Sequence, residues 1–204
     1  MTKKKMVIFA SAAAPMPSPS TMPSKPARSM RKSRPWSAIS RAHRSWTALR
    51  NGAYRSFWPT ANPSTRKRSL KNYILDAIEP YQADIICLAG FMRLLSGDFI
   101  SHYEHKMLNI HPALLPSFRG LHAQRQAIEA GVKIAGCTVH FVVPDMDAGP
   151  IILQSAVPVY EDDTEDTLAA RILTKEHPTY IKAAALFCDD KLTVRGNVVM
   201  GTQE

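Results

Sequence analysis

The segment CTVHFVVPDMDAGPIILQSAVPV, residues 137–159, decides the fold class. It starts with an apolar run over 137–143, passes through a loop rich in Pro, Asp and Gly over 144–150, and returns to an apolar run over 151–159. Short apolar runs that are rich in β-branched residues and bounded by turn-forming residues are typical of β-strands. The segment therefore predicts two strands of a sheet, joined by a loop.

Helices and further strands alternate on both sides of this segment. The continuous apolar run over 83–91 is typical of a parallel strand that is buried on both faces. The pattern also predicts strands within 6–10, 108–116 and 191–199, helices within 66–80, 92–107 and 119–131, and a long helix over 163–188 that Asp163 or Thr164 caps. Strands that alternate with helices predict an α/β fold with a sheet that is mostly parallel at its centre.

The charge is distributed unevenly along the chain. The first 75 residues contain 16 Lys and Arg and no Asp or Glu, whereas residues 76–204 contain 10 Lys and Arg and all 17 acidic residues. One interpretation is a basic arm that binds nucleic acid through its charge and stacks bases on Trp36, Trp46 and Trp58. The other is a segment that encodes no folded structure, since its Pro, Ser, Arg and Ala residues show neither helical nor strand periodicity.

Several classes of protein are disfavoured by the composition. No apolar run approaches the roughly 18 residues that a membrane-spanning helix needs, and the apolar core after the first lysines is too short for an export signal. The three cysteines, Cys87, Cys137 and Cys188, are odd in number and far apart in apolar surroundings, which argues against a disulfide framework and a metal site. We therefore expect buried thiols in a soluble, cytoplasmic protein without a metal ion.

Three polar residues stand where an α/β fold places its chemistry. Asn109 and His111 are two apart in an extended segment, so their side chains point to the same face, and Pro112 keeps His111 out of helical geometry. Asp147 follows a predicted strand in the kind of loop where open α/β sheets bind ligands. On chemistry alone, the alternative interpretation of the Asn-x-His-Pro sequence is a structural turn.

An amide, an imidazole and a carboxylate together can stabilise a tetrahedral acyl-transfer intermediate. Asn109 would donate a hydrogen bond to the oxyanion, His111 would act as general acid and base or as a cation, and Asp147 would orient His111 and stabilise its charged form. A substrate amine can attack directly, so this chemistry needs no nucleophilic cysteine or serine.

The C-terminal two-thirds of the chain resembles the phosphoribosylglycinamide formyltransferase family of folate-dependent purine-synthesis enzymes. The resemblance runs from about residue 69 to 185 and is carried by LAGFMRLLS (88–96), LNIHPALLPSFRGLHAQRQAIEAG (108–131), GCTVHFVVPDMDAGPIILQSAVPV (136–159) and TLAARILTKEH (167–177). It implies a Rossmann-like sheet with flanking helices that forms a single domain over residues 1–204. It also implies transfer of a formyl group from 10-formyltetrahydrofolate to the amine of glycinamide ribonucleotide, by a monomer or homodimer that binds neither nucleic acid nor membranes.

Residue roles follow from the same resemblance, position by position. Asn109, His111 and Asp147 match the family's catalytic residues and are called the catalytic trio below. Glu176 matches the acidic residue that contacts the nucleotide substrate, and Thr138 and His140 match residues that support the trio. The residues that match the folate pocket are Met92, Arg93, Leu94, Leu95, Asn109 and Val143.

Two related enzyme classes share parts of this pattern. Formyltetrahydrofolate hydrolases share the Asn, His and Asp residues but usually carry an additional N-terminal regulatory domain, for which 204 residues leave little room. Methionyl-tRNA formyltransferases carry an additional C-terminal domain. The sequences GLHAQRQAI and KEH favour the ribonucleotide enzyme. A hydrolase-like enzyme, or an inactive or non-enzymatic binding protein with a basic arm, remains the alternative.

The family's phosphate-binding loop is missing after the first predicted strand, which with its flanks spans residues 1–11. The family has a loop like Ser-Gly-x-Gly-Ser-Asn there, whose backbone amides bind the substrate phosphate, whereas this chain has Ser-Ala-Ala-Ala-Pro-Met-Pro at 11–17. Alanine restricts the positive φ angles that such a loop uses, and Pro15 removes an amide donor. This exact chain is therefore expected to be poorly folded or inactive.

A shifted reading frame explains residues 12–65. Deleting one G from AGC GGC CGC GGC TCC AAT GCC, which encodes Ser-Gly-Arg-Gly-Ser-Asn-Ala, yields codons for Ser-Ala-Ala-Ala-Pro-Met-Pro. We hypothesise that a second change near 60–68 restores the frame for the catalytic and folate-binding part, 66–204, and that the segment between is irregular. Resequencing the coding DNA tests this, and a trace without either insertion or deletion relative to homologous genes would refute a sequencing error.

Overall fold

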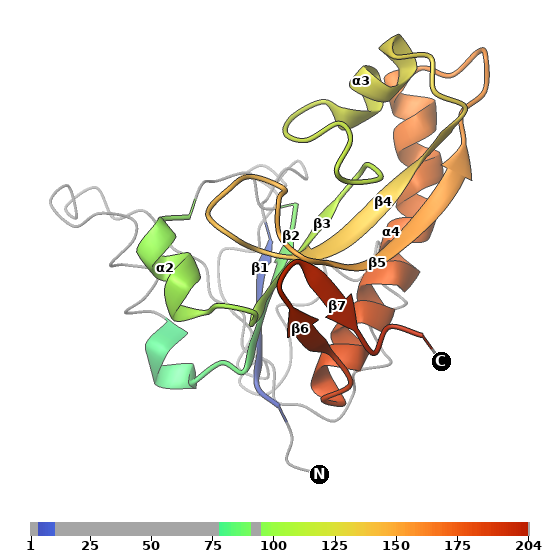
Figure 1. The fold of residues 1–204 in the computed structure, drawn as a ribbon. Helices are drawn as coiled ribbons and strands as arrows, with labels where there is room; N and C mark the ends of the chain where they lie inside the picture. Colours follow the sequence, from blue (N-terminus) through green and yellow to red (C-terminus); the bar gives the residue numbers. More distant parts are fainter. Residues whose placement is uncertain (1–3, 11–77, 91–94, 204) are drawn as a thin grey trace, which may run out of the picture.

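The computed structural model describes residues 4–10, 78–90 and 95–203 (Figure 1). The anomalous segment 12–65, most of the helix expected within 66–80, and Met92, Arg93 and Leu94 lie outside the described residues. Within the described part, Ile78 is buried and leads into a short 3-10 helix, η4 (Glu79–Tyr81).

The described strands form one seven-stranded sheet in the order β1-β2-β3-β4-β5-β7-β6. Each predicted strand before the long helix is present. Their bounds are β1 (Met6–Ala10), β2 (Ile85–Ala89), β3 (Met107–His111), β4 (Ile134–Phe141), β5 (Ile151–Pro158), β6 (Thr193–Arg195) and β7 (Val198–Met200). The predicted α/β class is confirmed.

The sheet is mixed, and β4 runs antiparallel to both of its neighbours. β1, β2 and β3 are parallel, whereas β4 pairs antiparallel with both β3 and β5. The single strand expected within 191–199 is wrong, because the chain reverses at Gly196 (φ 58) and forms the β6–β7 hairpin. β7 then pairs parallel with β5, which places this hairpin beside the start of β5.

The long helix α4 (Glu165–Cys188) covers one face of the sheet (Figure 1). Thr164 is its N-cap: its hydroxyl accepts from the Thr167 amide, and the Thr167 hydroxyl accepts from the Thr164 amide. The Tyr180 hydroxyl lies 3.0 Å from the carbonyl oxygens of both Leu88 and Leu108, so it ties α4 to β2 and β3. The core between α4 and the sheet includes Ile85, Cys87, Leu108, Val139, Phe141, Ile152, Tyr180 and Ala183.

The opposite face of β2 and β3 is covered by α2 (Gly97–His102) and η4. Ser96 is the N-cap of α2, and serine is one of the residues preferred at that position. The buried residues on this face include Ile78, Ile86, Leu88, Phe99, Tyr103 and Met107, and the half-buried Leu95 packs against them.

The helix expected within 119–131 is shorter than predicted. α3 spans Ala123–Glu129, because His122 before it adopts a left-handed conformation (φ 57) and residues 119–122 form a loop. Gly131 follows the helix with φ 68, as its position in the sequence predicts. α3 is attached to α4 by the Glu165 carboxylate, which accepts hydrogen bonds from both Nε and Nη2 of Arg125.

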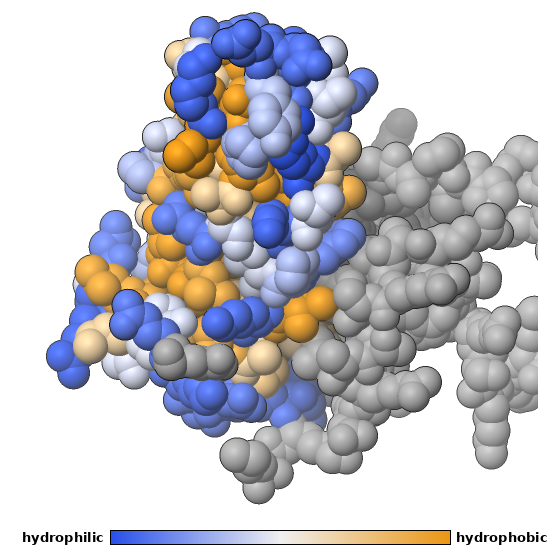
Figure 2. Space-filling model, turned by 90° about the vertical axis from the view of Figure 1, so that its right-hand side faces the viewer, coloured by the Kyte–Doolittle hydropathy of each residue, from blue (hydrophilic) through white to orange (hydrophobic). Residues whose placement is uncertain are grey.

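The face shown in Figure 2 has hydrophilic residues at its upper and lower ends and apolar surface between them. Among the described residues, the most exposed large apolar side chains are Leu121, Val198, Ile134, Tyr160 and Met146. Within the same part of the chain, no helix is long and apolar enough to cross a membrane.

Candidate active site

The pairing of β3 with β4 brings four of the predicted site residues together. Asn109 lies opposite His140 and His111 lies opposite Thr138 in this antiparallel pair. Residues two apart on a strand share a face, so both residues of each strand point the same way. Asp147 reaches this face from the loop between β4 and β5.

His111 has an acceptor near each ring nitrogen. Nε2 lies 2.8 Å from the Phe118 carbonyl oxygen, and Nδ1 lies 3.4 Å from Oδ2 of Asp147. Because a carbonyl only accepts, Nε2 carries a proton and donates it to Phe118. The side chains of His111 and Asp147 are 6% and 11% exposed, so both contacts lie largely out of water. A doubly protonated ring satisfies both acceptors at once, which suits a residue that stores and delivers a proton.

The Asp147 carboxylate is held by the backbone around it. Its Oδ2 accepts a hydrogen bond from the Gly120 amide at 2.9 Å. Asp147 has φ 51, a left-handed conformation that Asp tolerates better than most residues. Gly149 lets the loop turn back against β4, because a Cβ there would lie 1.8 Å from the Phe141 carbonyl oxygen. The loop thus fixes the direction in which the carboxylate points.

His140 is a neutral base that orients Asn109. It is 2% exposed, and this burial lowers its pKa below the ordinary value for histidine. Its Nδ1 lies 2.9 Å from the Phe141 carbonyl and donates to it, which leaves Nε2 as an acceptor. The Asn109 Nδ2 group lies 3.4 Å from this Nε2 and donates to it. One amide N–H is thereby committed to His140, and the second can point at a reacting oxygen.

Thr138 is fully buried and contacts the loop that follows His111. Its hydroxyl donates to the Ala113 carbonyl at 2.6 Å and accepts from the Leu115 amide at 3.0 Å. Thr138 therefore supports the loop, and among the described residues it makes no hydrogen bond to the side chains of the trio.

Three further predicted site residues outside the trio are Leu95, Val143 and Glu176. Leu95 is half-buried beside the α2 face, and Val143 is half-buried in the loop before Asp147. Glu176 lies on α4, near Cys137 of β4, and burial raises its pKa above the ordinary value for glutamate. No hydrogen bond or ion pair joins it to the trio within the described ranges 4–10, 78–90 and 95–203.

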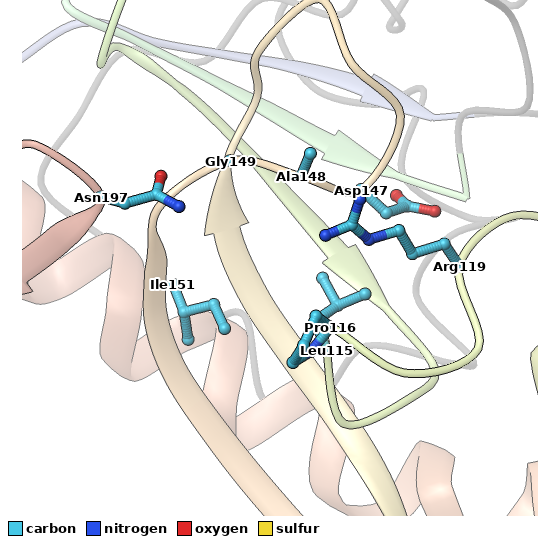
Figure 3. Close-up of a pocket in the computed structure, with 8 residues that line it drawn as sticks. All are labelled: Leu115, Pro116, Arg119, Asp147, Ala148, Gly149, Ile151 and Asn197. Atoms are coloured by element: carbon cyan, nitrogen blue, oxygen red, sulfur yellow. The ribbon is translucent and has the colours of Figure 1, made fainter.

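A pocket of about 210 Å³ opens beside Asp147 (Figure 3). Asp147 and the Arg119 side chain lie at one end of it, and Asn197 from the β6–β7 turn lies at the other. Leu115 and Ile151 contribute apolar surface between them. A small molecule bound here would therefore meet both apolar walls and the carboxylate of the trio.

Three groups near the trio were not predicted from the sequence. The Phe118 carbonyl and the Gly120 amide are backbone groups, which residue types do not reveal. Gln154 of β5 donates through Nε2 to the Leu115 carbonyl at 3.0 Å and to the Thr138 hydroxyl at 2.9 Å. Its place opposite Thr138 follows from the β4–β5 register, a signal that single-strand periodicity does not contain. No group of three or more His, Cys, Asp or Glu residues in the described part could hold a metal ion.

Comparisons with known proteins agree with this arrangement. The family model described as formyl transferase matches residues 7–184. The phosphoribosylglycinamide formyltransferase of Escherichia coli (strain K12) is 47% identical over 124 residues, which are 61% of this chain and 58% of that protein. The chain thus spans little more than half the length of this relative.

Solved structures show the same fold. A phosphoribosylglycinamide formyltransferase from Anaplasma phagocytophilum superposes with a TM-score of 0.63 at 49% identity, over 65% of this chain and 66% of that chain. A formyltetrahydrofolate deformylase from Pseudomonas syringae pv. tomato superposes with a TM-score of 0.62 at 30% identity, over 68% of this chain and 46% of that chain. The Rossmann-like formyltransferase fold expected from the sequence is confirmed.

Proposed function

Because the chain belongs to the formyl transferase family, we propose that it transfers a formyl group from 10-formyltetrahydrofolate to the amine of glycinamide ribonucleotide. The observation that carries this proposal is that Asn109 and His111 share one face of β3 and that Asp147 reaches His111 from the loop between β4 and β5. The names of the Escherichia coli and Anaplasma relatives, with 47% and 49% identity, support the choice of acceptor.

The proposed reaction begins with attack of the acceptor amine on the formyl carbon. A carbon–nitrogen bond forms, and the electron pair of the carbonyl moves onto its oxygen. The second N–H of Asn109 donates a hydrogen bond to that oxygen, and the positive charge of the protonated His111 ring stabilises it electrostatically, because both N–H groups of that ring are directed at Phe118 and Asp147. Asp147 stabilises the cationic ring.

The intermediate then collapses toward products. The bond between the formyl carbon and N10 of the folate breaks, N10 gains a proton, and the attacking nitrogen loses one. His111 and Asp147 are the groups placed to carry these protons, since they are in direct contact and largely buried. The products are formylglycinamide ribonucleotide and tetrahydrofolate.

Both substrates would be held by the remaining predicted residues. We assign Leu95 and Val143, together with Met92, Arg93 and Leu94, to the folate pocket. Leu95 and Val143 are half-buried apolar side chains, which suits the wall of a pocket for a flat ring. We assign Glu176 to the ribose hydroxyls of the acceptor, because a carboxylate accepts hydrogen bonds from them. The protein would act in the cytoplasm as a monomer or homodimer, without metal or nucleic acid.

A transfer assay tests the proposal. The full chain is incubated with 10-formyltetrahydrofolate and glycinamide ribonucleotide, and formylglycinamide ribonucleotide is measured by mass spectrometry. The account predicts product that depends on His111. A folded chain that binds the folate but forms no product even at millimolar acceptor would refute it. The expectation of poor folding or inactivity, which rests on residues 11–17, stays a prediction that the same assay decides.

Hydrolysis of 10-formyltetrahydrofolate is the second candidate. The Pseudomonas deformylase supports it through its fold and its 30% identity, and water can replace the amine at the same trio. Formate release without glycinamide ribonucleotide, unchanged when it is added, would favour hydrolysis. Formate release that gives way to formylated ribonucleotide on addition of the acceptor would favour transfer.

A further inference from the structure

Gln154 lies on β5 and contacts the loop that follows the catalytic His111. Its side chain is exposed at the surface, but its Nε2 group reaches inward to the Leu115 carbonyl at 3.0 Å and the Thr138 hydroxyl at 2.9 Å. Thr138 pairs with Gln154 on one side and with His111 on the other. Gln154 is therefore two strands away from His111 and yet connected to it through the loop.

Gln154 and Thr138 together fix the start of that loop. The Thr138 hydroxyl holds the Ala113 carbonyl and the Leu115 amide, and Gln154 holds the Leu115 carbonyl. Both backbone polar groups of Leu115 are thus bonded to side chains of the sheet. Hydrogen bonds between a loop and a rigid strand restrict the positions that the following residues can take.

The same loop returns to the catalytic trio three residues later. The Phe118 carbonyl, on a residue with φ 55, accepts the Nε2 proton of His111 at 2.8 Å. The Gly120 amide donates to Asp147 at 2.9 Å. The far end is held by Gln126, which donates to the Arg119 carbonyl at 3.2 Å and to the Leu121 carbonyl at 2.9 Å.

We propose that Gln154 is a positioning residue that fixes the protonation site of His111 through the Phe118 carbonyl. Two acceptors compete for the ring, Phe118 at Nε2 and Asp147 at Nδ1. With the loop held in place, the neutral ring keeps its proton on Nε2. When the loop moves away, the carboxylate is the stronger remaining acceptor, so the neutral ring moves its proton to Nδ1.

The consequence for catalysis rests on the proposed function. A neutral His111 with its proton on Nε2 has a free lone pair at Nδ1, which faces Asp147. This lone pair can accept the proton that the attacking nitrogen loses. A ring with its proton on Nδ1 cannot accept there. Substitution of Gln154 should therefore slow the chemical step without weakening the binding of either substrate.

The test is NMR of the full chain labelled with ¹⁵N-histidine, because protonated and bare ring nitrogens have well-separated shifts. Gln154→Met preserves the length of the side chain and removes its donors. From pH 6 to pH 9, Nε2 of His111 should keep its proton in the unmodified chain. In Gln154→Met the proton should be on Nδ1 at the alkaline end. His111→Ala identifies the signals.

Matched variants separate positioning from general loss of structure. Gln124→Met makes the same chemical change on α3, where that side chain has no hydrogen bond to the described residues, and should leave the His111 signals unchanged. Thr138→Ser retains the hydroxyl that bonds to Leu115 and Gln154, and the His111 proton should stay on Nε2. A His111 ring in Gln154→Met that keeps its proton on Nε2 at every pH overturns the proposal.

Kinetics provide a second and separate readout. Gln154→Met should lower kcat about tenfold, the effect expected from the loss of one or two ordinary hydrogen bonds, with both KM values unchanged. A rise in KM with unchanged kcat contradicts the proposal. The NMR result needs no turnover, so a tautomer shift in a chain without formyl transfer would refute the proposed function while supporting the role of Gln154.

Discussion

Nδ1 of His111 faces Oδ2 of Asp147 across 3.4 Å, and both side chains are largely buried. A carboxylate at this distance stabilises a charged imidazole, and burial strengthens the interaction because water screens it less. The Gly120 amide fixes the carboxylate from the other side. This pair is the part of the site on which the proposed chemistry depends most.

Asp147→Asn should abolish most of the activity without unfolding the protein. Asn tolerates the left-handed φ of this position as well as Asp does, but an amide does not stabilise the charged His111 ring. We expect kcat for formyl transfer to fall by about 10²- to 10³-fold, with the melting temperature within a few degrees of the unmodified chain. Asp145→Asn, at an exposed position of the same loop, is the control and should retain its activity. Equal activities of the two variants would remove Asp147 from the mechanism.

Gly149→Ala should destabilise the loop that carries Asp147. The added Cβ would lie 1.8 Å from the Phe141 carbonyl oxygen and 2.8 Å from its carbon, which forces the backbone to move. A loss of about 2 kcal/mol or more is expected, measured as a lower midpoint in chemical denaturation. Gly97→Ala is the matched control, since a Cβ there meets no atom within 4 Å. A Gly149→Ala variant as stable as the control would contradict this close approach.

Glu176→Gln should raise stability and weaken substrate binding. Burial raises the pKa of this carboxyl, so its ionised form is disfavoured in the folded protein. The buried charge therefore lowers the stability of the parent protein. This loss is absent at acid pH, where the carboxyl is protonated, and it appears as the pH rises through the folded pKa. At pH 7 the variant should melt roughly 2–4 °C higher, the shift that corresponds to about 1 kcal/mol in a chain of this size.

The pH dependence of the higher melting temperature of Glu176→Gln is the control for this prediction. Below about pH 4 the two proteins should melt at the same temperature, because the carboxyl is then neutral in both. If Glu176 contacts the acceptor, KM for glycinamide ribonucleotide should rise as well. A variant that is less stable than the parent at pH 7 would show that the carboxylate has a favourable partner.

Acid destabilisation should depend in part on Asp163. The Arg171 guanidinium donates two hydrogen bonds to this carboxylate, 2.6 and 2.7 Å long, and holds its pKa well below the usual range. A lowered folded pKa contributes stability above the unfolded pKa, near 4, and this contribution disappears as the pH falls through the folded value. Asp163→Asn should therefore lower the melting temperature at pH 7 and converge with the parent at the lowest pH values.

Asp162→Asn is the control for this prediction, because Asp162 is an exposed neighbour on the same loop. It should shift the melting temperature little at any pH. A deficit in Asp163→Asn that stays constant between pH 7 and pH 2 would show that the ion pair with Arg171 is not its cause.

Much of the fold follows from local pattern. The apolar runs locate β2, β4 and β5 to within a few residues, because burial and side-chain alternation act on each strand separately. The N-cap of α4 is Thr164, one of the two residues that the sequence predicts for this position. The sequence predicts one strand in place of the β6–β7 hairpin, because the turn at Gly196 and Asn197 is a short interruption of an otherwise continuous pattern. The sequence pattern predicts a start of α3 that is too early, because the left-handed conformation of His122 leaves no local signal.

The site was less predictable than the fold. The two-residue spacing of Asn109 and His111 is visible in the sequence, but the register that brings His140 opposite Asn109 is a property of the assembled sheet. The same holds for Gln154, which meets the loop after His111 only through the β4–β5 pairing. Backbone groups such as the Phe118 carbonyl contribute without any dependence on residue type.

The most direct test of the central claim follows the formyl group itself. The full chain and its His111→Ala variant are incubated with 10-formyltetrahydrofolate labelled with ¹⁴C in the formyl carbon, with and without glycinamide ribonucleotide. The account predicts label in the ribonucleotide for the unmodified chain and a rate at least about 100-fold lower for the variant. Equal transfer by the two folded proteins, or binding of the folate without any movement of label, would contradict it.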